Sequence, residues 1–306
     1  MRRSPDAAPR RRLAGWIGIT IAALLVGCSS GDDEQRPQTE PKGPPAVRFE
    51  GGSLPGKIYI AAGPDELNAD VYRVQGTLSD ARRLTWGGRV SALTAWGGEV
   101  VVADARRSGS DRLESLDLRA PDALPGRVID PRGQAPELSR SGRLTWSVPL
   151  YGSEGQNAGT RVYVADARGG GRRIAYQSPR DLTSGWGPDG RLAVLVGHPQ
   201  KLVLDPGTPR ETALDLGLES TLNFQTASDG TLWALGRGAV VIVSPSGASR
   251  RLRANWLPIT WSPDGRSILV VRGARLGLLS PGDGSVREIG TVQNGVLLTA
   301  DWIGSE

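Results

Sequence analysis

The stretch Trp261-Ser-Pro-Asp-Gly-Arg-Ser-Ile-Leu-Val-Val271 decides the fold of this 306-residue chain. It passes from a large aromatic side chain through a Pro-Asp-Gly turn into a run of apolar and β-branched residues. The Asp-Gly step supplies the positive φ angle that a tight hairpin needs, and the apolar run has the length of a buried strand. The stretch therefore predicts a turn that leads directly into a strand.

The same unit recurs along the chain, which indicates a repeat architecture. A clear second copy is Trp186-Gly-Pro-Asp-Gly190 followed by an apolar run, and weaker copies lie upstream and between the two. The turn glycines of the five copies are Gly98, Gly142, Gly190, Gly230 and Gly265. Their intervals of 35 to 48 residues are typical of propeller blades, each of four antiparallel strands.

A sixth blade is predicted from the two ends of the repeat region. Segments 57–61, 70–74 and 82–85 match the second, third and fourth strands of the unit, and segment 296–302 matches its first strand. Pairing of the C-terminal strand with these N-terminal strands closes the ring and removes open sheet edges. The sequence thus predicts an all-β, six-bladed β-propeller.

Six tryptophans fall at what we read as equivalent places in the blades. We expect them to pack between blades, with an aromatic binding platform as the less favoured interpretation. They are Trp96, Trp146, Trp186, Trp233, Trp261 and Trp302.

The repeat resembles that of TolB-like propellers, whose blades carry Trp-Ser-Pro-Asp-Gly-Lys before an apolar strand. The clearest matches are 186–196 and 261–271, with a degraded copy at 226–235, and the periodicity extends over 57–302. This resemblance implies a fold and leaves the ligand open, because the repeated residues build turns and blade packing. The actinobacterial LpqB lipoproteins also join a lipid-attachment motif to a propeller, but they carry a further domain between the two for which this chain has no room.

The first residues are typical of an export signal. Residues 1–12 are basic, 13–26 are apolar, and Leu25-Val-Gly-Cys28 follows. This order resembles the lipobox of bacterial lipoproteins, which implies that residues 1–27 are removed and that Cys28 carries acyl chains such as palmitate. Two or more chains give a stable membrane anchor. The alternatives left open are an uncleaved short anchor and a buried free cysteine.

Residues 28–55 are rich in Pro, Gly and acidic residues and lack periodicity, which predicts a flexible linker after the lipidated cysteine. The expected domains are therefore a signal peptide at 1–27, a linker at 28–55 and a propeller at 56–306. The isoelectric point near 9.8 suggests a nucleic-acid partner at first. Of the net charge of +5, however, residues 1–27 hold +4, so we expect no nucleic acid to bind the nearly neutral remainder.

Composition excludes several classes of site. One cysteine and one histidine rule out a disulfide framework, a Cys-rich zinc site and two-His metal motifs. Segment 51–58 has P-loop spacing, but Ile58 stands where Ser or Thr would bind Mg²⁺, and a strand pattern follows where a helix is required. We therefore expect no cofactor, no metal and no catalytic constellation.

The loops between second and third strands are predicted to be long in three consecutive blades, at 63–69, 105–112 and 149–160. Propellers usually bind ligands on the face that carries these loops, although surface loops also vary neutrally. The candidate residues on that face are Asp65, Glu66, Asp70, Asp111, Tyr151, Glu154, Asn157 and His198.

These features favour a monomeric, lipid-anchored propeller outside the cytoplasm that serves as a binding or scaffold module for a protein or ligand of the cell envelope. The alternative is a hydrolase or lyase acting on envelope glycans or peptides. It would use His198, the rim carboxylates and Tyr151.

Overall fold

The computed structural model describes residues 47–105, 111–120, 122–153, 155–197, 200–218, 221–236, 239–253 and 255–304. The predicted signal peptide, Cys28 and most of the predicted linker lie outside these residues. No helix within the described ranges is long and apolar enough to span a membrane.

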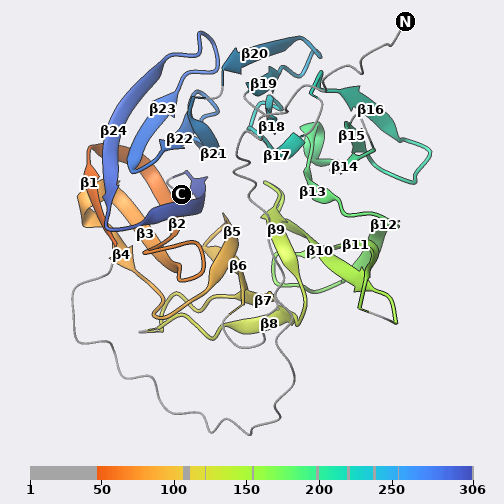
Figure 1. Cartoon of the computed structure of the whole chain (residues 1–306), viewed down its shortest axis with the longest axis horizontal. Helices are drawn as coiled ribbons and strands as arrows, with labels where there is room; N and C mark the ends of the chain where they lie inside the picture. The colour runs from red at the N-terminus through yellow and green to blue at the C-terminus, as the bar shows by residue number, and fades with distance from the viewer. Residues whose placement is uncertain are drawn as a thin grey trace, which may run out of the picture. The chain divides into compact units, whose positions relative to one another are not determined.

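Six antiparallel sheets form a six-bladed β-propeller, and Figure 1 shows the sheets arranged around a common centre. Blade 1 contains β5 (Val90–Trp96), β6 (Glu99–Asp104), β7 (Arg112–Ser115) and β8 (Arg127–Asp130). Blade 2 contains β9 (Gln134–Leu138), β10 (Arg143–Tyr151), β11 (Asn157–Asp166) and β12 (Arg173–Ser178). Blade 3 contains β13 (Thr183–Trp186), the 3-10 turn η2 (Pro188–Gly190), β14 (Leu192–Val196), β15 (Lys201–Leu204) and β16 (Thr212–Asp215).

The remaining blades follow the same order. Blade 4 contains β17 (Thr221–Thr226), β18 (Leu232–Gly236), β19 (Ala239–Val243) and β20 (Ser249–Arg253). Blade 5 contains β21 (Leu257–Trp261), β22 (Ile268–Arg272), β23 (Arg275–Leu279) and β24 (Val286–Gln293). Blade 6 contains β25 (Val296–Ile303), β2 (Ser53–Gly63), β3 (Asp70–Thr77), the 3-10 turn η1 (Leu78–Asp80) and β4 (Arg82–Arg83).

The predicted repeat and its closure are confirmed. Each of the five turn glycines lies between the first and second strands of its blade with a positive φ angle, from 67° at Gly190 to 84° at Gly230. β25 pairs with β2 in antiparallel register, with Trp302 opposite Ile58. The indole Nε1 of Trp302 also donates to the Pro55 carbonyl at 2.6 Å. The last blade is therefore assembled from both ends of the repeat region.

The core is divided among the six junctions between blades. Each of six clusters of buried apolar side chains, drawn from the described residues, joins two neighbouring sheets. At the junction of blades 2 and 3, for example, Val162 and Val164 pack with Trp186 and Val194. Burial of apolar area at these junctions is what holds the blades in a ring.

The tryptophans do not occupy one equivalent place, which corrects the sequence interpretation. Trp186, Trp261 and Trp302 end or nearly end the first strands of their blades, whereas Trp146 and Trp233 lie fully buried in second strands. Trp96 also ends a first strand but keeps 38% of its surface exposed. The shared role is packing between blades, and Trp96 also contacts the neighbouring blade, since its Nε1 donates to the Arg140 carbonyl at 2.7 Å.

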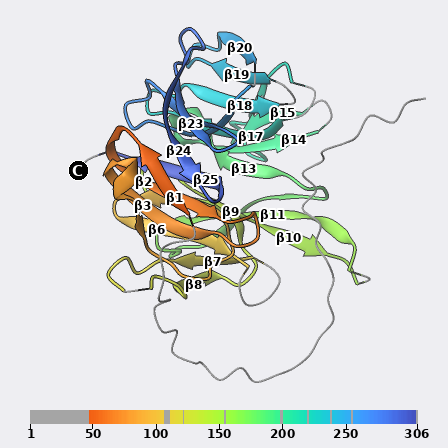
Figure 2. The ribbon, with the colours of Figure 1, turned by 60° about the vertical axis from the view of Figure 1, so that its left-hand side comes forward.

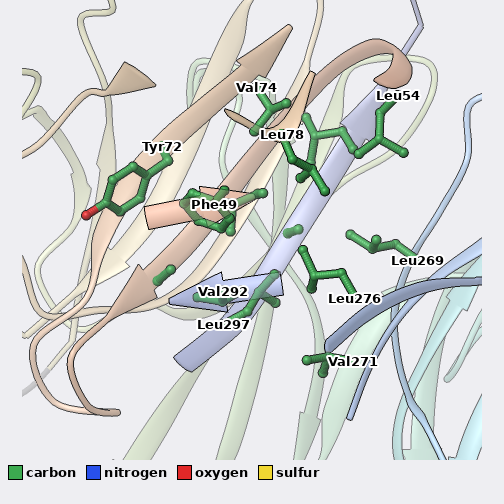
Figure 3. Packing of buried hydrophobic residues seen from close by; sticks show 14 of the residues in the cluster. Phe49, Leu54, Tyr72, Val74, Leu78, Leu269, Val271, Leu276, Val292 and Leu297 are labelled. Carbon is green, nitrogen blue, oxygen red and sulfur yellow. The ribbon is translucent and has the colours of Figure 1, made fainter. Parts of the chain in front are cut away.

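The propeller begins earlier than the predicted boundary between residues 55 and 56. β1 (Arg48–Gly51) pairs with β24 as a fifth strand of blade 5, with Arg48 opposite Gln293. Figure 2 shows β1 beside β2 and near β24. In Figure 3, Phe49 lies between the N-terminal strands and Val292, and its ring meets Tyr72 edge-on with centroids 5.3 Å apart. Composition predicted a linker here because the buried residues Val47 and Phe49 stand in a stretch that is otherwise polar and rich in proline.

Candidate functional site

Hydrogen bonds join the first strands of neighbouring blades around the propeller axis. The backbone N–H of Trp186 donates to Glu137 Oε1 at 3.4 Å, and its indole Nε1 donates to the Glu137 carbonyl at 2.9 Å. The next repeat of this pattern joins Trp261 to the Oε1 and the carbonyl of Gln225, at 3.0 and 3.2 Å. A residue just before the turn of one blade thus accepts both bonds from the tryptophan of the following blade.

Smaller side chains make similar bonds from blade 6 to blade 1 and from blade 1 to blade 2. Asp301 Oδ2 accepts hydrogen bonds from the Ala95 N–H at 2.8 Å and from Thr94 Oγ1 at 2.9 Å. Thr94 Oγ1 in turn accepts from the Leu138 N–H at 2.9 Å. Polar side chains near the axis therefore satisfy backbone donors of the neighbouring blade, which buried donors require.

Blade 3 carries Gly185 at the position where blade 2 carries Glu137. A Cβ atom built on Gly185 would overlap Glu137 Oε2 and would also crowd the ring of Phe224. The missing side chain therefore leaves the space into which the Glu137 carboxylate extends.

A cavity of about 800 Å³ lies at this end of the propeller axis. Its walls are the first-strand ends and first turns of blades 1 to 5, together with the end of β25. We call it the axial cavity. Its position is opposite to the face that carries the loops between second and third strands, because those loops leave the other ends of the same strands.

The axial cavity is rich in acids. Its lining holds four carboxylates from four blades and one guanidinium, namely Glu137, Asp189, Asp229, Asp301 and Arg140. With every acid ionised, the lining has a formal charge of −3. An acidic concave site of this kind concentrates positively charged molecules.

Enclosure by protein shifts the pKa values of three of these groups. Burial raises the pKa of Glu137 to about 8, and the charge of Asp301 acts in the same direction, whereas the Trp186 N–H opposes it. Burial also raises the pKa of Asp301, against the bonds from Ala95 and Thr94. Burial lowers the pKa of Arg140, although Asp229 and Asp301 favour its charge. Carboxylates with raised pKa values in a cavity are typical of functional sites.

The candidates in the first predicted loop have structural bonds. Asp65 accepts from the Leu67 N–H at 2.8 Å and from the side chain of Asn68, which builds a local turn and lowers its pKa. Asp70 is buried, forms an ion pair with Arg83 and accepts from the Gly88 N–H at 2.8 Å. Glu66 is exposed beside them. The structure brings these three together only as chain neighbours.

The third predicted loop is mostly strand, which corrects the expectation for 149–160. β10 and β11 pair as far as Tyr151 opposite Asn157. Pro149 is tolerated there because β10 pairs with β9 only up to Ser147, so the extension has one neighbouring strand. Tyr151 is 56% exposed, and Asn157 bonds to the Gly159 N–H and to Asp181.

The other three candidates are Asp111, Glu154 and His198. Asp111 accepts from Ser91 Oγ at 3.1 Å, and burial raises its pKa. Glu154 and His198 lie outside the described residues. None of the described candidates lines the axial cavity.

Sequence reasoning did not find the axial cavity or its acids. A signal was present, since Glu137, Gln225 and Asp301 each stand just before the turn position of a repeat copy. The prediction used the tryptophan and the turn glycine of each repeat copy and did not use the residue that precedes the tryptophan.

The described residues do not form a metal site or a nucleotide-binding loop of P-loop type. In the part of the chain that the structure describes, no three or more His, Cys, Asp or Glu residues are grouped so as to hold a metal ion. The segment with P-loop spacing forms the end of β1 and the start of β2 and leads into strand rather than helix, as expected.

Comparison with solved structures gives the same fold. TolB from Acinetobacter baumannii matches with a TM-score of 0.66 and 16% identity, over 82% of this chain and 67% of that chain. A protein assigned as TolB from Agrobacterium tumefaciens matches with a TM-score of 0.51 and 17% identity, over 77% of this chain and 91% of that one. These neighbours are TolB-like six-bladed propellers, and at such identities the likeness shows the fold alone.

No family model matches this chain. No curated protein matches it either.

Proposed function

We propose that this protein is a membrane-anchored, extracytoplasmic binding module, without enzymatic activity, that holds a protein or ligand of the cell envelope in its axial cavity. The observation that carries this proposal is the cavity of about 800 Å³ to which all six blades contribute. Its volume lies in the range of pockets that enclose small molecules or short peptide segments.

The geometry favours a preformed binding site over one that must rearrange when a ligand binds. The wall residues Glu137, Gln225 and Asp301 are fixed by bonds to neighbouring blades, so a ligand meets a preformed surface. A preorganised site loses little conformational entropy on binding. The carboxylates of Asp65 and Asp70, which the enzyme alternative would use, are held in a turn and an ion pair.

The anchoring part of the proposal rests on the order basic, apolar, small and Cys28 in the sequence. The test is Cys28→Ser in the native host. The variant should leave the membrane fraction and appear in the soluble extracytoplasmic fraction, because no acyl chain can be attached. Retention of the variant in membranes would contradict lipid anchoring.

The binding part is tested by site-specific photo-crosslinking in the native host. A photoreactive residue at Ser228, exposed in the cavity wall, should give a discrete crosslinked product. The matched control is Thr212, exposed on the outer strand β16 and outside the lining. Products of equal yield at both positions, or none at Ser228, would contradict the use of this cavity.

A further inference from the structure

Most of the exposed large apolar side chains lie on the face that carries the loops between second and third strands, which we call the loop face. Among the described residues, eight such side chains are exposed, and five of them stand on this face. The five are Leu67, Tyr151, Leu222, Leu257 and Val296. Single exposed apolar residues are normal on a protein surface, whereas several gathered at one end indicate an interaction surface.

Four of these residues belong to three consecutive blades. Leu222, Leu257 and Val296 stand at or next to the starts of β17, β21 and β25, the first strands of blades 4, 5 and 6. These strands contact their neighbours in the ring, and Figure 1 shows β17 and β21 at its inner side. Leu67 lies in the loop after β2, whose last residue pairs with Val296. We call these four residues, with the half-buried Trp256 beside Leu257, the loop-face patch.

The chain enters the propeller beside this patch. Val47 is buried, and a Cβ built on Gly295 would overlap it, so Val47 packs against the residue that precedes Val296. Residues 29–46 separate Val47 from the proposed lipid anchor at Cys28. A flexible chain of that length spans about 23 Å, from roughly 5–6 Å × √n. The proposed anchor would therefore hold the loop face toward the bilayer and the axial cavity away from it.

Arginines border the patch on blades 4 and 5. Arg253 ends β20, Arg272 ends β22 and Arg275 begins β23, and all three are exposed. Glu288 lies 3.1 Å from Arg275 and 3.9 Å from Arg272, and Arg272 also stacks over the ring of Trp256, 4.7 Å from its centroid. A guanidinium group matches the geometry of phosphate, and Trp, Leu and Arg together are typical of surfaces that lie in the headgroup layer of a membrane.

The blade 6 side of the patch is acidic. Asp65 and Glu66 are exposed beside Leu67, and the Leu67 N–H donates to Asp65 within the loop. Lipid phosphates repel these two carboxylates and attract the arginines of blades 4 and 5. Contact with a bilayer should therefore be deepest around Leu257.

We propose that the loop face lies on the lipid bilayer, with Leu222, Leu257 and Val296 among the headgroups. Arg253 and Arg272 then contact lipid phosphates, and the axial cavity opens away from the membrane. This inference rests on the anchoring part of the proposed function and adds an orientation to it. Acyl chains keep the protein at the membrane, and the patch selects the face that meets the lipid. A contact of this kind adds to an acyl anchor and needs no membrane-spanning segment.

The test uses the acylated protein from the native host, reconstituted into vesicles of phosphatidylethanolamine and phosphatidylglycerol. Leu257→Cys provides a thiol for an environment-sensitive fluorophore, while acylation blocks the thiol of Cys28, the chain's one cysteine. The matched control is Ile174→Cys, because Ile174 is 52% exposed and Leu257 49%, but Ile174 lies near the start of β12, at the opposite end of the propeller. Lipids with a nitroxide near the headgroup should quench the label at position 257 at least about threefold more than the label at position 174.

A second pair of variants tests whether the patch itself makes the contact. Leu222→Ser combined with Val296→Ser removes two apolar groups that flank the label and should lower the quenching at position 257 by about half. The control is Val128→Ser, at a 41% exposed position of the outer strand β8, and it should leave the quenching unchanged. Near-ultraviolet circular dichroism checks folding. Arg253→Gln, at an exposed strand end, should also lower the quenching and decides alone if the double variant unfolds.

Equal quenching at positions 257 and 174, or unchanged quenching in the folded patch variant, would overturn the inference. A shift of the label at position 257 to shorter wavelength without quenching would also overturn it, because a protein rather than lipid would then cover the patch. Failure of the anchor is seen separately. Protein that sediments with the vesicles but is quenched equally at both positions keeps the anchor and loses only the docking. Labelling of Cys28 in the unmodified chain, or protein left in the supernatant, would reject the anchor and the inference with it.

Discussion

Thr94 Oγ1 donates a hydrogen bond of 2.9 Å to Asp301 Oδ2, although 207 positions separate the two residues in the chain. Thr94 belongs to blade 1 and Asp301 to the C-terminal strand of blade 6, so the bond crosses the point where the ring closes. Backbone pairing of β25 with β2 closes the last blade, and this side-chain contact ties the closed blade to its neighbour.

Replacing Asp301 by Ala should therefore destabilise the ring. The change removes the acceptor for Thr94 and leaves the Ala95 N–H without its side-chain partner. An unsatisfied buried donor costs about 1–3 kcal/mol in the free energy of unfolding, which urea denaturation measures. Asp301→Asn keeps an acceptor oxygen and should lose less. Equal stability of the Ala variant and the unmodified chain would show that the contact adds nothing.

Stability should fall as pH rises from about 5 to about 8. The pKa of Glu137 is raised from 4.5 to about 8, so in this window the native state holds a proton that the unfolded chain has released. The slope contributed by this group is at most about 1.4 kcal/mol per pH unit, and the raised pKa of Asp301 acts in the same direction. Urea midpoints at several pH values should show a smaller slope for Glu137→Gln. An identical slope in the variant would contradict this assignment.

Phe49 tests where the propeller begins. Phe49→Ala should lower the free energy of unfolding by about 3 kcal/mol, because the ring is buried against Tyr72 in the junction of blades 5 and 6. Glu50→Ala, at the next and exposed position of β1, is the control and should change stability by less than about 0.5 kcal/mol. If residues 47–51 were linker, the two variants would behave alike.

Two variants of Trp302 compare how much packing and hydrogen bonding contribute to stability where the ring closes. Trp302→Ala removes a buried ring and should cost about 3–5 kcal/mol. Trp302→Phe keeps most of the apolar contact and loses the bond from Nε1 to the Pro55 carbonyl, so it should cost less. Thermal denaturation of both variants gives the comparison, and an equal loss would mean that packing is not the larger part.

Gly185 should not tolerate a side chain. Gly185→Ala places a Cβ against Glu137 Oε2 and must displace the carboxylate, at a cost of about 1–3 kcal/mol. Gly190→Ala is an informative comparison, since the turn of the same blade offers open space for the Cβ but has a φ of 67°. Combining Gly185→Ala with Glu137→Ala should recover stability if the clash is the cause, and a purely additive double variant would refute it.

Much of the fold was predictable because the repeat encodes local geometry. A glycine with positive φ after each first strand, as at Gly190 and Gly265, fixes the hairpin, and apolar alternation fixes which residues enter the junctions. Closure followed from counting strands, since segment 296–302 lacked a partner and segments 57–61, 70–74 and 82–85 lacked a first strand. The hairpin and the alternation are local, and closure followed because the strand count of every other blade was already known from the repeat.

The features that escaped prediction depend on long-range placement. β1 reads as linker because only Val47 and Phe49 of its segment are apolar, and their burial arises from β24 and β3, more than 20 positions away. The cavity acids escaped for the same reason, since Glu137 and Asp301 approach each other only when the ring closes. The candidates on the opposite face all remain predictions, and among them Asp65, Asp70 and Asn157 also form bonds within the fold.

The addition of β1 to the edge of β24 also has a mechanical consequence. Tension applied through the chain ahead of Val47 reaches β1 first, and the four residue pairs that join β1 to β24 must part before β2 is loaded. The load then passes to the pairing of β2 with β25, which holds the ring shut. The pairing of β1 with β24 at the edge of blade 5 therefore has to break before a force on the N-terminal side can open the propeller.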